Sequence, residues 1–425
     1  MNSSKPHTAV NDRVRASAFC CNRAWKAATT LALALALFSA LVLAAGQPAQ
    51  AQTLTTLYSF TGGTDGATPA GGMIFDPQGN LYGVTGAGGA YGHGTVFEIT
   101  VAGAEKVLYS FTGGADGSKP NGDLTRDAQG NLYGTTFYGG AYNYGTVFEV
   151  TAAGLETVLY SFTGGSDGAY PQGGLVSDAE GSLYGCTADP WYDFTKVPHT
   201  LFKVNASGVF SVIYTFPPLG RNRNAQSPNG GLVLDSQGNF YGTTMFGGNP
   251  LDQCPHHIGL GCGTVFKVTP SGTETVLLDL QYIGAAWPTA GLVADAQGNL
   301  YGTSTQGGPH GHGTVFELTS SGTGKLLYQF QAGRDASDPQ SRLVLDGVGN
   351  LYGTTWKGGG DGKGAVFEIT ASGTEEVVYG FNPKKHPGVG TNPSGALVFD
   401  AQGNLYGMTA GGGAYGFGTV YKLAP

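Results

Sequence analysis

The residues best suited to ligand chemistry lie in three irregular segments between positions 189 and 262. They combine aromatic rings with acidic, arginine and histidine side chains, namely Trp191, Tyr192, Asp193, Arg221, Arg223, His256 and His257. Aromatic faces give a large, rigid contact area and the polar groups give hydrogen bonds, so this combination is typical of a ligand-binding site. The alternative is ordinary variation in loop length without a function, because surface loops tolerate insertions freely.

Two cysteines flank the histidines in the last of these segments. Cys254, His256, His257 and Cys262 could suggest zinc, but adjacent histidines and this cysteine spacing fit no standard structural zinc pattern. In an oxidising compartment we expect Cys254 and Cys262 to pair as a disulfide, with no metal bound. Cys186 is then left over, most simply as a small buried residue in a strand.

A second candidate site is the charged pair Asp123 and Arg342. Each replaces a small residue at equivalent positions of an internal repeat. The expected fold places them on blades that face each other across the mouth of a central channel. A plug or simple salt bridge and a catalytic pair both fit this position, since ion-pair networks also gather at such places.

Two repeated motifs resemble ligand-binding loops but favour a structural interpretation. The Gly-Gly-x4-Gly-Thr motif, first at Gly88–Thr95, has the spacing of a phosphate loop but lacks its lysine and its helix. A single aspartate recurs four residues before a proline, at Asp65, Asp116, Asp167 and Asp335. One carboxylate per loop is a weak ligand set for calcium, so we expect turn-forming residues and no cofactor.

No nucleophile, base and acid stand together in this sequence. Most carboxylates fall at repeated positions, such as Glu98, Glu149, Glu317 and Glu368. Repeated residues serve the repeat, whereas catalysis would need a singular cluster. The sequence therefore favours a non-enzymatic binding or surface-interaction protein. A polysaccharide hydrolase or lyase, and a structural envelope protein without a discrete site, stay open as alternatives.

An internal repeat predicts the elements that position these residues. The phrase Asn-Leu-Tyr-Gly or a close variant begins at Asn80, Asn131, Ser182, Asn239, Asn299, Asn350 and Asn404. The starting positions are 51 to 60 residues apart. Repeats of about this length with short β-rich runs are typical of β-propeller blades. We therefore predict an all-β, seven-bladed propeller with four antiparallel strands per blade. The blades are expected at about 68–111, 119–162, 170–216, 227–280, 287–330, 338–381 and 392–424.

The strand order predicts how the ring is closed and on which face each connection lies. Residues 54–60 match a fourth strand with no blade before it, so we expect them to complete the seventh blade and remove its open edge. Turns between strands one and two and between three and four share one face and are tight. The longer loops share the other face, which carries all three irregular segments on blades three and four.

The repeated phrases resemble a known tandem repeat. Gly-Asn-Leu-Tyr-Gly-Thr-Thr, Gly-Gly-x4-Gly-Thr-Val-Phe-Glu and Val-Leu-Tyr-Ser-Phe are similar to the GloVer repeat over residues 54–424. The resemblance implies a secreted bacterial "choice-of-anchor" protein. It implies no settled activity and no catalytic residue.

The first 51 residues have the pattern of a secretory signal peptide. Basic residues precede an uncharged stretch at 27–45, and Ala49-Gln50-Ala51 gives a cleavage pattern. We expect a mature chain 52–425 in a secreted or periplasmic location, with a retained membrane anchor as the alternative.

Charge and composition narrow the class of partner. Removing residues 1–51 takes five basic and one acidic residue from totals of 21 and 29, which leaves a net charge of −12. An acidic protein is a poor partner for nucleic acid or anionic lipid. Only 12% of residues are charged, so the surface is built largely of neutral polar groups. We expect a monomer, with no membrane span after cleavage, whose partner is a glycan or a cell-surface protein.

Overall fold

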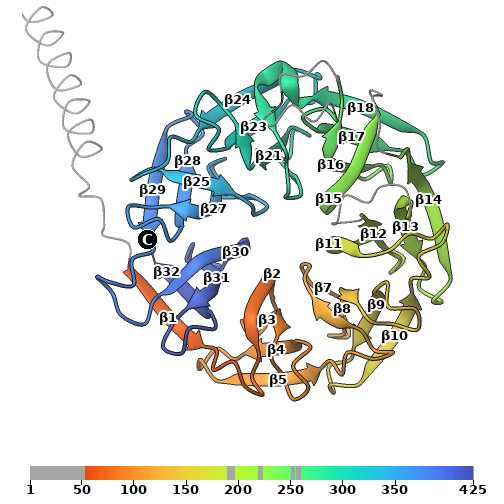
Figure 1. Cartoon of the computed structure of the whole chain (residues 1–425), viewed down its shortest axis with the longest axis vertical. Helices are drawn as coiled ribbons and strands as arrows, with labels where there is room; N and C mark the ends of the chain where they lie inside the picture. Colours follow the sequence, from red (N-terminus) through yellow and green to blue (C-terminus); the bar gives the residue numbers. More distant parts are fainter. Residues whose placement is uncertain (1–52, 189–196, 219–223, 250–253, 255–259, 425) are drawn as a thin grey trace, which may run out of the picture. The chain divides into compact units, whose positions relative to one another are not determined.

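The structure is a computed structural model that describes residues 53–188, 197–218, 224–249, 254 and 260–424. The chain divides into two units, Met1–Ala51 and Gln52–Pro425, and everything below concerns the second. That unit is a ring of seven antiparallel sheets around a central axis (Figure 1). Within the described ranges the one helical element is the short 3-10 turn η1 (Leu280–Ile283). The predicted all-β, seven-bladed propeller is confirmed.

Each blade has four strands that run from the axis outward. In blade one they are β2 (Ala67–Phe75), β3 (Leu81–Ala87), β4 (Thr95–Ile99) and β5 (Glu105–Ser110). Blade three has β11 (Pro171–Ser177), β12 (Leu183–Thr187), β13 (His199–Val204) and β14 (Phe210–Phe216). Blade four has β15 (Ala225–Leu234), β16 (Phe240–Gly247), β17 (Thr264–Val268) and β18 (Glu274–Asp279).

In blades two, five and six the innermost strand is split into two pieces. Blade two has β6 (Ser118–Pro120), β7 (Thr125–Arg126), β8 (Leu132–Tyr138), β9 (Thr146–Val150) and β10 (Glu156–Ser161). Blade five has β19 (Ala285–Ala286), β20 (Val293–Ala294), β21 (Leu300–Ser304), β22 (Gln306–Gly307), β23 (Thr314–Leu318) and β24 (Gly324–Gln329). Blade six has β25 (Ala336–Pro339), β26 (Val344–Leu345), β27 (Leu351–Gly358), β28 (Ala365–Ile369) and β29 (Glu375–Gly380). Asp123 and Arg342 lie in two of these breaks.

The seventh blade combines the two ends of the described chain. It contains β30 (Gly390–Phe399), β31 (Leu405–Gly412) and β32 (Thr419–Ala424), and β1 (Thr53–Ser59) lies antiparallel to β32. The register joins Thr53 to Ala424 and Ser59 to Thr419. In Figure 1 the red-orange β1 lies along the blue seventh blade.

Hydrogen bonds explain why the Asn-Leu-Tyr-Gly phrase repeats. Asp76 ends the inner strand, and its carboxylate accepts hydrogen bonds from the backbone and side-chain nitrogens of Asn80 at 2.8 and 2.9 Å. The hydroxyl of Tyr82 donates to the same carboxylate at 3.0 Å. A Cβ on Gly83 would lie only 2.7 Å from the ring of Phe97, so this position must stay glycine for the ring to lie across the strand.

The hydrophobic core lies between neighbouring blades. A fully buried phenylalanine follows each of several outer strands and packs edge-on against an aromatic ring of the next blade. Phe60 contacts Phe97 at 5.2 Å between ring centroids, and Phe111 contacts Phe148 at 5.1 Å. One blade cannot bury these rings alone, which is why the repeats depend on their neighbours.

The β1–β32 pairing generates the first testable prediction. Phe60 is fully buried, so Phe60→Ala should lower the free energy of unfolding by about 3–5 kcal/mol. Deleting residues 52–60 should destabilise the mature protein further, because it also exposes the edge of β32. Thr55→Ala, at an exposed position of the same strand, is the control and should change stability by less than about 0.5 kcal/mol. Thermal unfolding measures all three, and a deletion variant that melts at the wild-type temperature would contradict closure by this strand.

Candidate functional site

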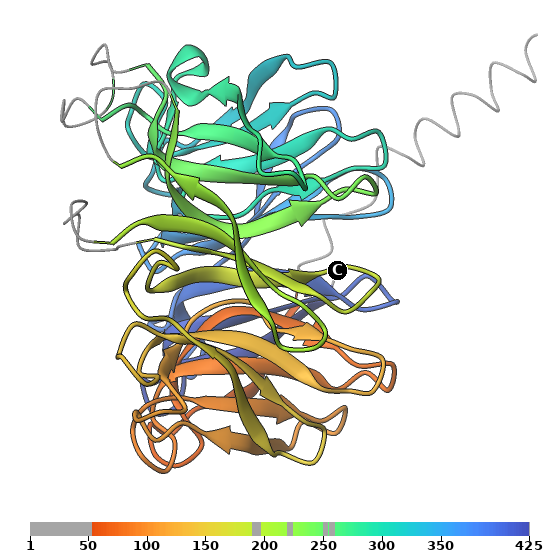
Figure 2. The same ribbon diagram turned by 90° about the vertical axis from the view of Figure 1, so that its right-hand side faces the viewer.

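The two faces of the ring differ in the length of their connections. Figure 2 shows the ring from the side, with strands running between the faces. On one face, tight turns such as Asp76–Asn80 and Thr100–Ala104 are closed by backbone hydrogen bonds. The other face carries the longer loops. The predicted ligand contacts Trp191, Tyr192, Asp193, Arg221, Arg223, His256 and His257 lie outside the described residues. Their role stays a prediction.

A disulfide fixes the base of the irregular segment in blade four. Cys254 and Cys262 are bonded, and both are buried. They pack against Ala286 and Trp287 at the start of blade five, where the backbone N–H of Trp287 donates to the Cys262 carbonyl at 2.9 Å. Cys186 is the free cysteine of the described residues, and burial raises the pKa of its thiol. The disulfide therefore ties the blade-four insertion to the scaffold.

One position per blade has a left-handed backbone on the long-loop face. Its φ lies between 54° and 62°, and it directly precedes a proline. The seven residues are Thr68, Lys119, Tyr170, Ser227, Trp287, Asp338 and Asn392. A left-handed φ costs a non-glycine residue about 1–3 kcal/mol. In blade three, for example, the Tyr170 N–H donates to the Tyr144 carbonyl of blade two at 2.8 Å. This contact between blades offsets the strain and holds seven different side chains in one repeated geometry.

Two of these positions build an aromatic cluster between blades two and three. We define the aromatic cluster as Lys119, Phe137, Tyr138, Tyr144 and Tyr170. Tyr170 stacks on Phe137 with centroids 5.3 Å apart and meets the edges of Tyr138 and Tyr144 at 5.8 and 5.7 Å. The Lys119 ammonium lies 5.6 Å from the Phe137 centroid and 5.9 Å from that of Tyr138. No carboxylate belongs to this cluster.

The aromatic cluster was not predicted from the sequence. Its members are spread over about fifty positions, and the stacking depends on the left-handed backbone at Tyr170. A usable signal was present, because the residue before each repeated proline differs from blade to blade while the proline does not. Phe137 likewise stands where blade one has Gly86 and blade three has Ala188.

Asp123 and Arg342 form an ion pair across the central channel. The Arg342 guanidinium lies 3.2 Å from the Asp123 carboxylate. The backbone N–H of Gly72 also donates to that carboxylate, at 2.5 Å. A Cβ on Gly174 would lie only 2.7 Å from the Asp123 Cβ, so small residues on the flanking blades make room for the acid. Both groups of the pair are already partnered, which disfavours a role as acid and base.

The ion pair forms part of the lining of a small polar cavity that we call the axial cup. Its volume is about 190 Å³. The residue after the repeated proline contributes a neutral polar side chain in five blades, namely Asn121, Gln172, Asn229, Thr289 and Gln340. Among the described residues, the Asn121 Oδ1 and Thr289 Oγ1 atoms are buried without a hydrogen-bond partner. Buried polar atoms of this kind need an explanation, and a bound polar group supplies one.

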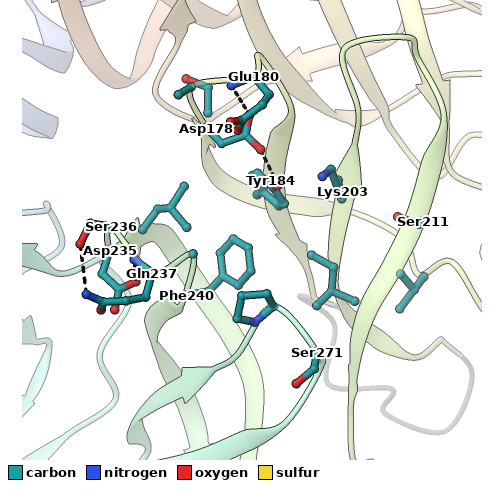
Figure 3. Close-up of a pocket in the computed structure, with 17 residues that line it drawn as sticks. Asp178, Glu180, Tyr184, Lys203, Ser211, Asp235, Ser236, Gln237, Phe240 and Ser271 are labelled. Atoms are coloured by element: carbon teal, nitrogen blue, oxygen red, sulfur yellow. Dashed lines mark hydrogen bonds between the residues drawn. The ribbon is translucent and has the colours of Figure 1, made fainter.

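A larger groove lies on the opposite face, between blades three and four (Figure 3). Its volume is about 930 Å³, and Asp178, Tyr184 and Lys203 face Asp235, Gln237 and Phe240 across it. The Tyr184 hydroxyl donates to Asp178 at 2.7 Å, and the Lys203 ammonium lies 5.2 Å from the Tyr184 ring centroid. Similar grooves of about 450 and 600 Å³ lie between the blades on either side. The groove therefore follows from blade geometry and is no singular site.

Repeated carboxylates in the described residues serve the blades. Burial acts to raise the pKa of Asp65, but hydrogen bonds from Thr61 and Tyr58 hold it below the usual value. The Thr61 hydroxyl donates at 2.5 Å and the Tyr58 hydroxyl at 3.0 Å, which supports a turn-forming role. Within the described part of the chain, no three histidine, cysteine or acidic side chains are grouped as metal ligands would be.

Three further carboxyl groups have pKa values close to neutral pH. Burial, followed by the charge of a nearby aspartate, raises the pKa of Glu105, Glu156 and Glu375 to about 7. One oxygen of each is buried without a hydrogen-bond partner in the described structure. All three occupy the same place at the start of an outer strand. Their repetition indicates a property of the scaffold and not a catalytic acid.

Comparison with known proteins supports the fold and the family. A sequence model described as the Gloeobacter/Verrucomicrobia repeat matches residues 46–197, 192–389 and 254–425, which confirms the resemblance found in the sequence. No curated protein matches the chain. None of the described helices is long and apolar enough to cross a membrane.

Solved structures share the architecture at low identity. An extracellular domain from B. thetaiotaomicron is 11% identical with a TM-score of 0.55, and the match covers 88% of this chain and 40% of that one. PorZ, a surface component of the type-IX secretion system of Porphyromonas gingivalis, is 15% identical with a TM-score of 0.50, over 82% and 46% of the two chains. A gluconolactonase from Xanthomonas campestris is 15% identical with a TM-score of 0.44, over 88% and 89%. The chain spans less than half of the first two proteins, and the similarities to those two concern the fold alone.

The raised carboxyl pKa values predict the pH dependence of stability. The pKa of Glu105, Glu156 and Glu375 rises from about 4.5 unfolded to about 7 folded. The folded state therefore binds these protons more tightly, and this stabilisation is complete below pH 4.5 and lost as the pH rises through 7. Changing all three to Gln should flatten the decline in melting temperature between pH 4.5 and 7. Glu376→Gln, at an exposed neighbouring position, is the control and should leave the decline intact. An unaltered decline in the triple variant would refute the assignment.

The disulfide predicts how many cysteines can be alkylated and how much stability is lost when the bond is removed. After alkylation in denaturant without reductant, the mature protein should carry one modified cysteine, Cys186. Replacing Cys254 and Cys262 together by Ala should destabilise the closed loop by roughly 2–3 kcal/mol in the chain-entropy model. Mass spectrometry that finds three alkylated cysteines in periplasmic material would show that the pair is reduced.

Proposed function

This chain belongs to the Gloeobacter/Verrucomicrobia repeat family, and we propose that it is a secreted or periplasmic binding protein for a neutral ligand rich in hydrogen-bonding groups. A glycan or an exposed segment of a cell-surface protein has this chemistry. The proposed binding surface is the long-loop face around the channel mouth. The fold alone does not select a function, because propellers serve many.

The aromatic cluster is the observation that carries this proposal. Stacked rings around Tyr170 offer a rigid, partly exposed surface, and the Lys119 ammonium is held against it. Aromatic residues give large contact areas with little loss of conformational entropy, which suits sugar faces and extended peptides. Two acids near the channel mouth are each paired with a base, Asp123 with Arg342 and Asp338 with Lys357, so the described surface offers hydrogen bonds and stacking without a paired-carboxylate centre.

The irregular segments of blades three and four extend the proposed surface. Trp191 and Tyr192 would add stacking area next to Tyr170, because they follow β12 of the same blade. Asp193, Arg221, Arg223, His256 and His257 would supply polar contacts. The disulfide at Cys254 supports this arrangement by anchoring one segment.

The disulfide and the leader support an oxidising compartment. Disulfides persist in secreted and periplasmic proteins and are rare in the cytosol. The basic start, uncharged stretch and Ala49-Gln50-Ala51 pattern support export with cleavage before residue 52. A partner met outside the cytoplasm fits a surface that is built mainly of neutral polar groups.

Binding should depend on the aromatic cluster more than on the repeated loops. The mature protein is screened against neutral glycans, cell-wall fragments and surface peptides, with a parallel assay for released product. Tyr170→Ala and Trp191→Ala should each weaken the selected ligand by at least about 1 kcal/mol, or fivefold, if they are anchors. Tyr91→Ala, an exposed tyrosine on a repeated loop of blade one, is the control and should have little effect.

Three outcomes would contradict the proposal in different ways. Equal losses for Tyr170→Ala and Tyr91→Ala would mean that the ligand is spread around the ring. Product release that depends on the long-loop face would favour a polysaccharide hydrolase or lyase. No binding to any probe would favour a structural envelope protein.

A further inference from the structure

We propose that the axial cup is a terminal subsite, which takes the end unit of a neutral saccharide while the aromatic cluster stacks on the next unit. This inference rests on the proposed binding function and makes it more specific. It names a neutral glycan as the ligand and an end-on orientation as the mode of binding. The contacts around the cup carry the argument.

The lining of the cup is neutral and offers both donors and acceptors. Side-chain amides come from Asn121, Gln172, Asn229 and Gln340, and a hydroxyl comes from Thr289. Three of the amides are partly committed to the protein. The Gln172 amide donates to the Ala188 carbonyl at 3.5 Å, the Asn229 side-chain oxygen accepts from the Gly230 N–H at 3.0 Å, and the Gln340 amide donates to Asp338 at 3.2 Å.

Two side chains of the cup are left with unsatisfied buried atoms. These are the Asn121 Oδ1 in blade two and the Thr289 Oγ1 in blade five, and neither has a partner among the described residues. Both atoms are shielded from solvent in the structure, so a ligand bonds to them only after the two side chains rotate toward the cup. Such a ligand must offer hydrogen-bonding groups in more than one direction. The hydroxyl groups around a sugar ring do this, because each can donate and accept.

The floor of the cup is electrically balanced. Asp123 and Arg342 neutralise each other at 3.2 Å, and the Gly72 N–H holds the acid in place. An ionised ligand would lose its hydration without finding an uncommitted counter-charge. The guanidinium beside Asp123 also disfavours a metal cation. A free peptide terminus carries a charge at neutral pH, so the lining favours a neutral saccharide over a peptide end.

The size of the cup limits what can enter. Its volume of about 190 Å³ lies below the 300–1,000 Å³ usual for drug-sized ligands. At about 30 Å³ per water, the space corresponds to about six water molecules. A single small unit fits this space better than an internal stretch of a polymer.

The aromatic cluster adjoins the cup along the chain. Tyr170, Pro171 and Gln172 are consecutive, so one strand start carries a ring of the cluster and an amide of the cup. Lys119, Pro120 and Asn121 repeat the same arrangement one blade earlier. One short ligand can therefore occupy both places, with its end in the cup and its next unit against the rings.

Saccharide probes of two lengths distinguish the contribution of the cup to binding from that of the aromatic cluster. Neutral methyl glycosides and N-acetylglucosamine serve as single-unit probes, and the matching linear oligosaccharides serve as longer probes. Calorimetric titration measures their affinity for the mature protein. Thr289→Val, which removes a cup hydroxyl, should weaken both lengths about 3- to 10-fold. Tyr170→Ala should weaken the oligosaccharides by a similar factor and leave the single units within about twofold.

Controls keep the result interpretable. Thr323→Val, in an exposed tight turn of the same blade on the opposite face, should change neither affinity. Asn121→Leu repeats the cup test from blade two if Thr289→Val does not fold. Cyclic oligosaccharides, which have no end, should bind at least tenfold more weakly than linear ones. Glucuronate and glucosamine should bind more weakly than neutral units.

The outcomes distinguish failure of the terminal subsite from failure of the proposed binding function. If Tyr170→Ala weakens oligosaccharides but both cup variants bind normally, or if cyclic and linear forms bind equally, the terminal subsite is refuted and the binding function stands. If no saccharide of either length binds, the end-on inference is overturned, and only a peptide ligand can then support the proposed function. If both variants behave as expected, the cup is the terminal subsite.

Discussion

Neighbouring inner strands meet backbone to backbone around the axis, and this close approach governs the rest of the propeller. A Cβ on Gly71 would lie 2.5 Å from the Gly122 carbonyl oxygen of the next blade, and its φ of 67° also favours glycine. Side chains are therefore excluded from most of the contact between neighbouring inner strands. They occur on either side of that contact, and residues that bind a ligand would have to lie there. The residue before the repeated proline adds a second contact, as in blades two and three, where the strained backbones of Lys119 and Tyr170 are held by hydrogen bonds to the preceding blade.

Residues that recur from blade to blade have structural roles, whereas residues that differ between blades are the candidates for ligand contacts. The Asp76, Asn80 and Tyr82 turn, the buried phenylalanines and the outer-strand carboxyls recur from blade to blade, and each has a structural explanation in hydrogen bonding or packing. The channel mouth is different, because the same backbone positions carry Lys119, Tyr170 or Trp287 in different blades. A uniform ring thus presents a non-uniform surface. That surface lies on the face that carries the longer loops.

The sequence predicted most of the scaffold and only part of the site. The spacing of Asn-Leu-Tyr-Gly was enough to predict seven four-stranded blades, because one repeat cannot bury its own rings. The short cysteine spacing and the oxidising compartment expected from the leader predicted the Cys254–Cys262 disulfide, which the structure contains. The aromatic cluster was missed, since Phe137 and Tyr170 meet only through blade packing and a left-handed φ. The axial cup was also missed, because its neutral polar side chains are single residues from five blades.

Hydrogen–deuterium exchange of the mature protein, with and without the ligand selected by screening, tests most directly whether the channel mouth is the binding surface. The account predicts slower exchange in segments 117–124, 168–174 and 285–291, which carry Lys119 and Tyr170 of the aromatic cluster and Asn121, Gln172 and Thr289 of the cup. It predicts unchanged exchange in tight turns such as 177–182 and 235–239, which border the large groove of the opposite face. Protection confined to that groove, or spread evenly over all seven blades, would contradict the account.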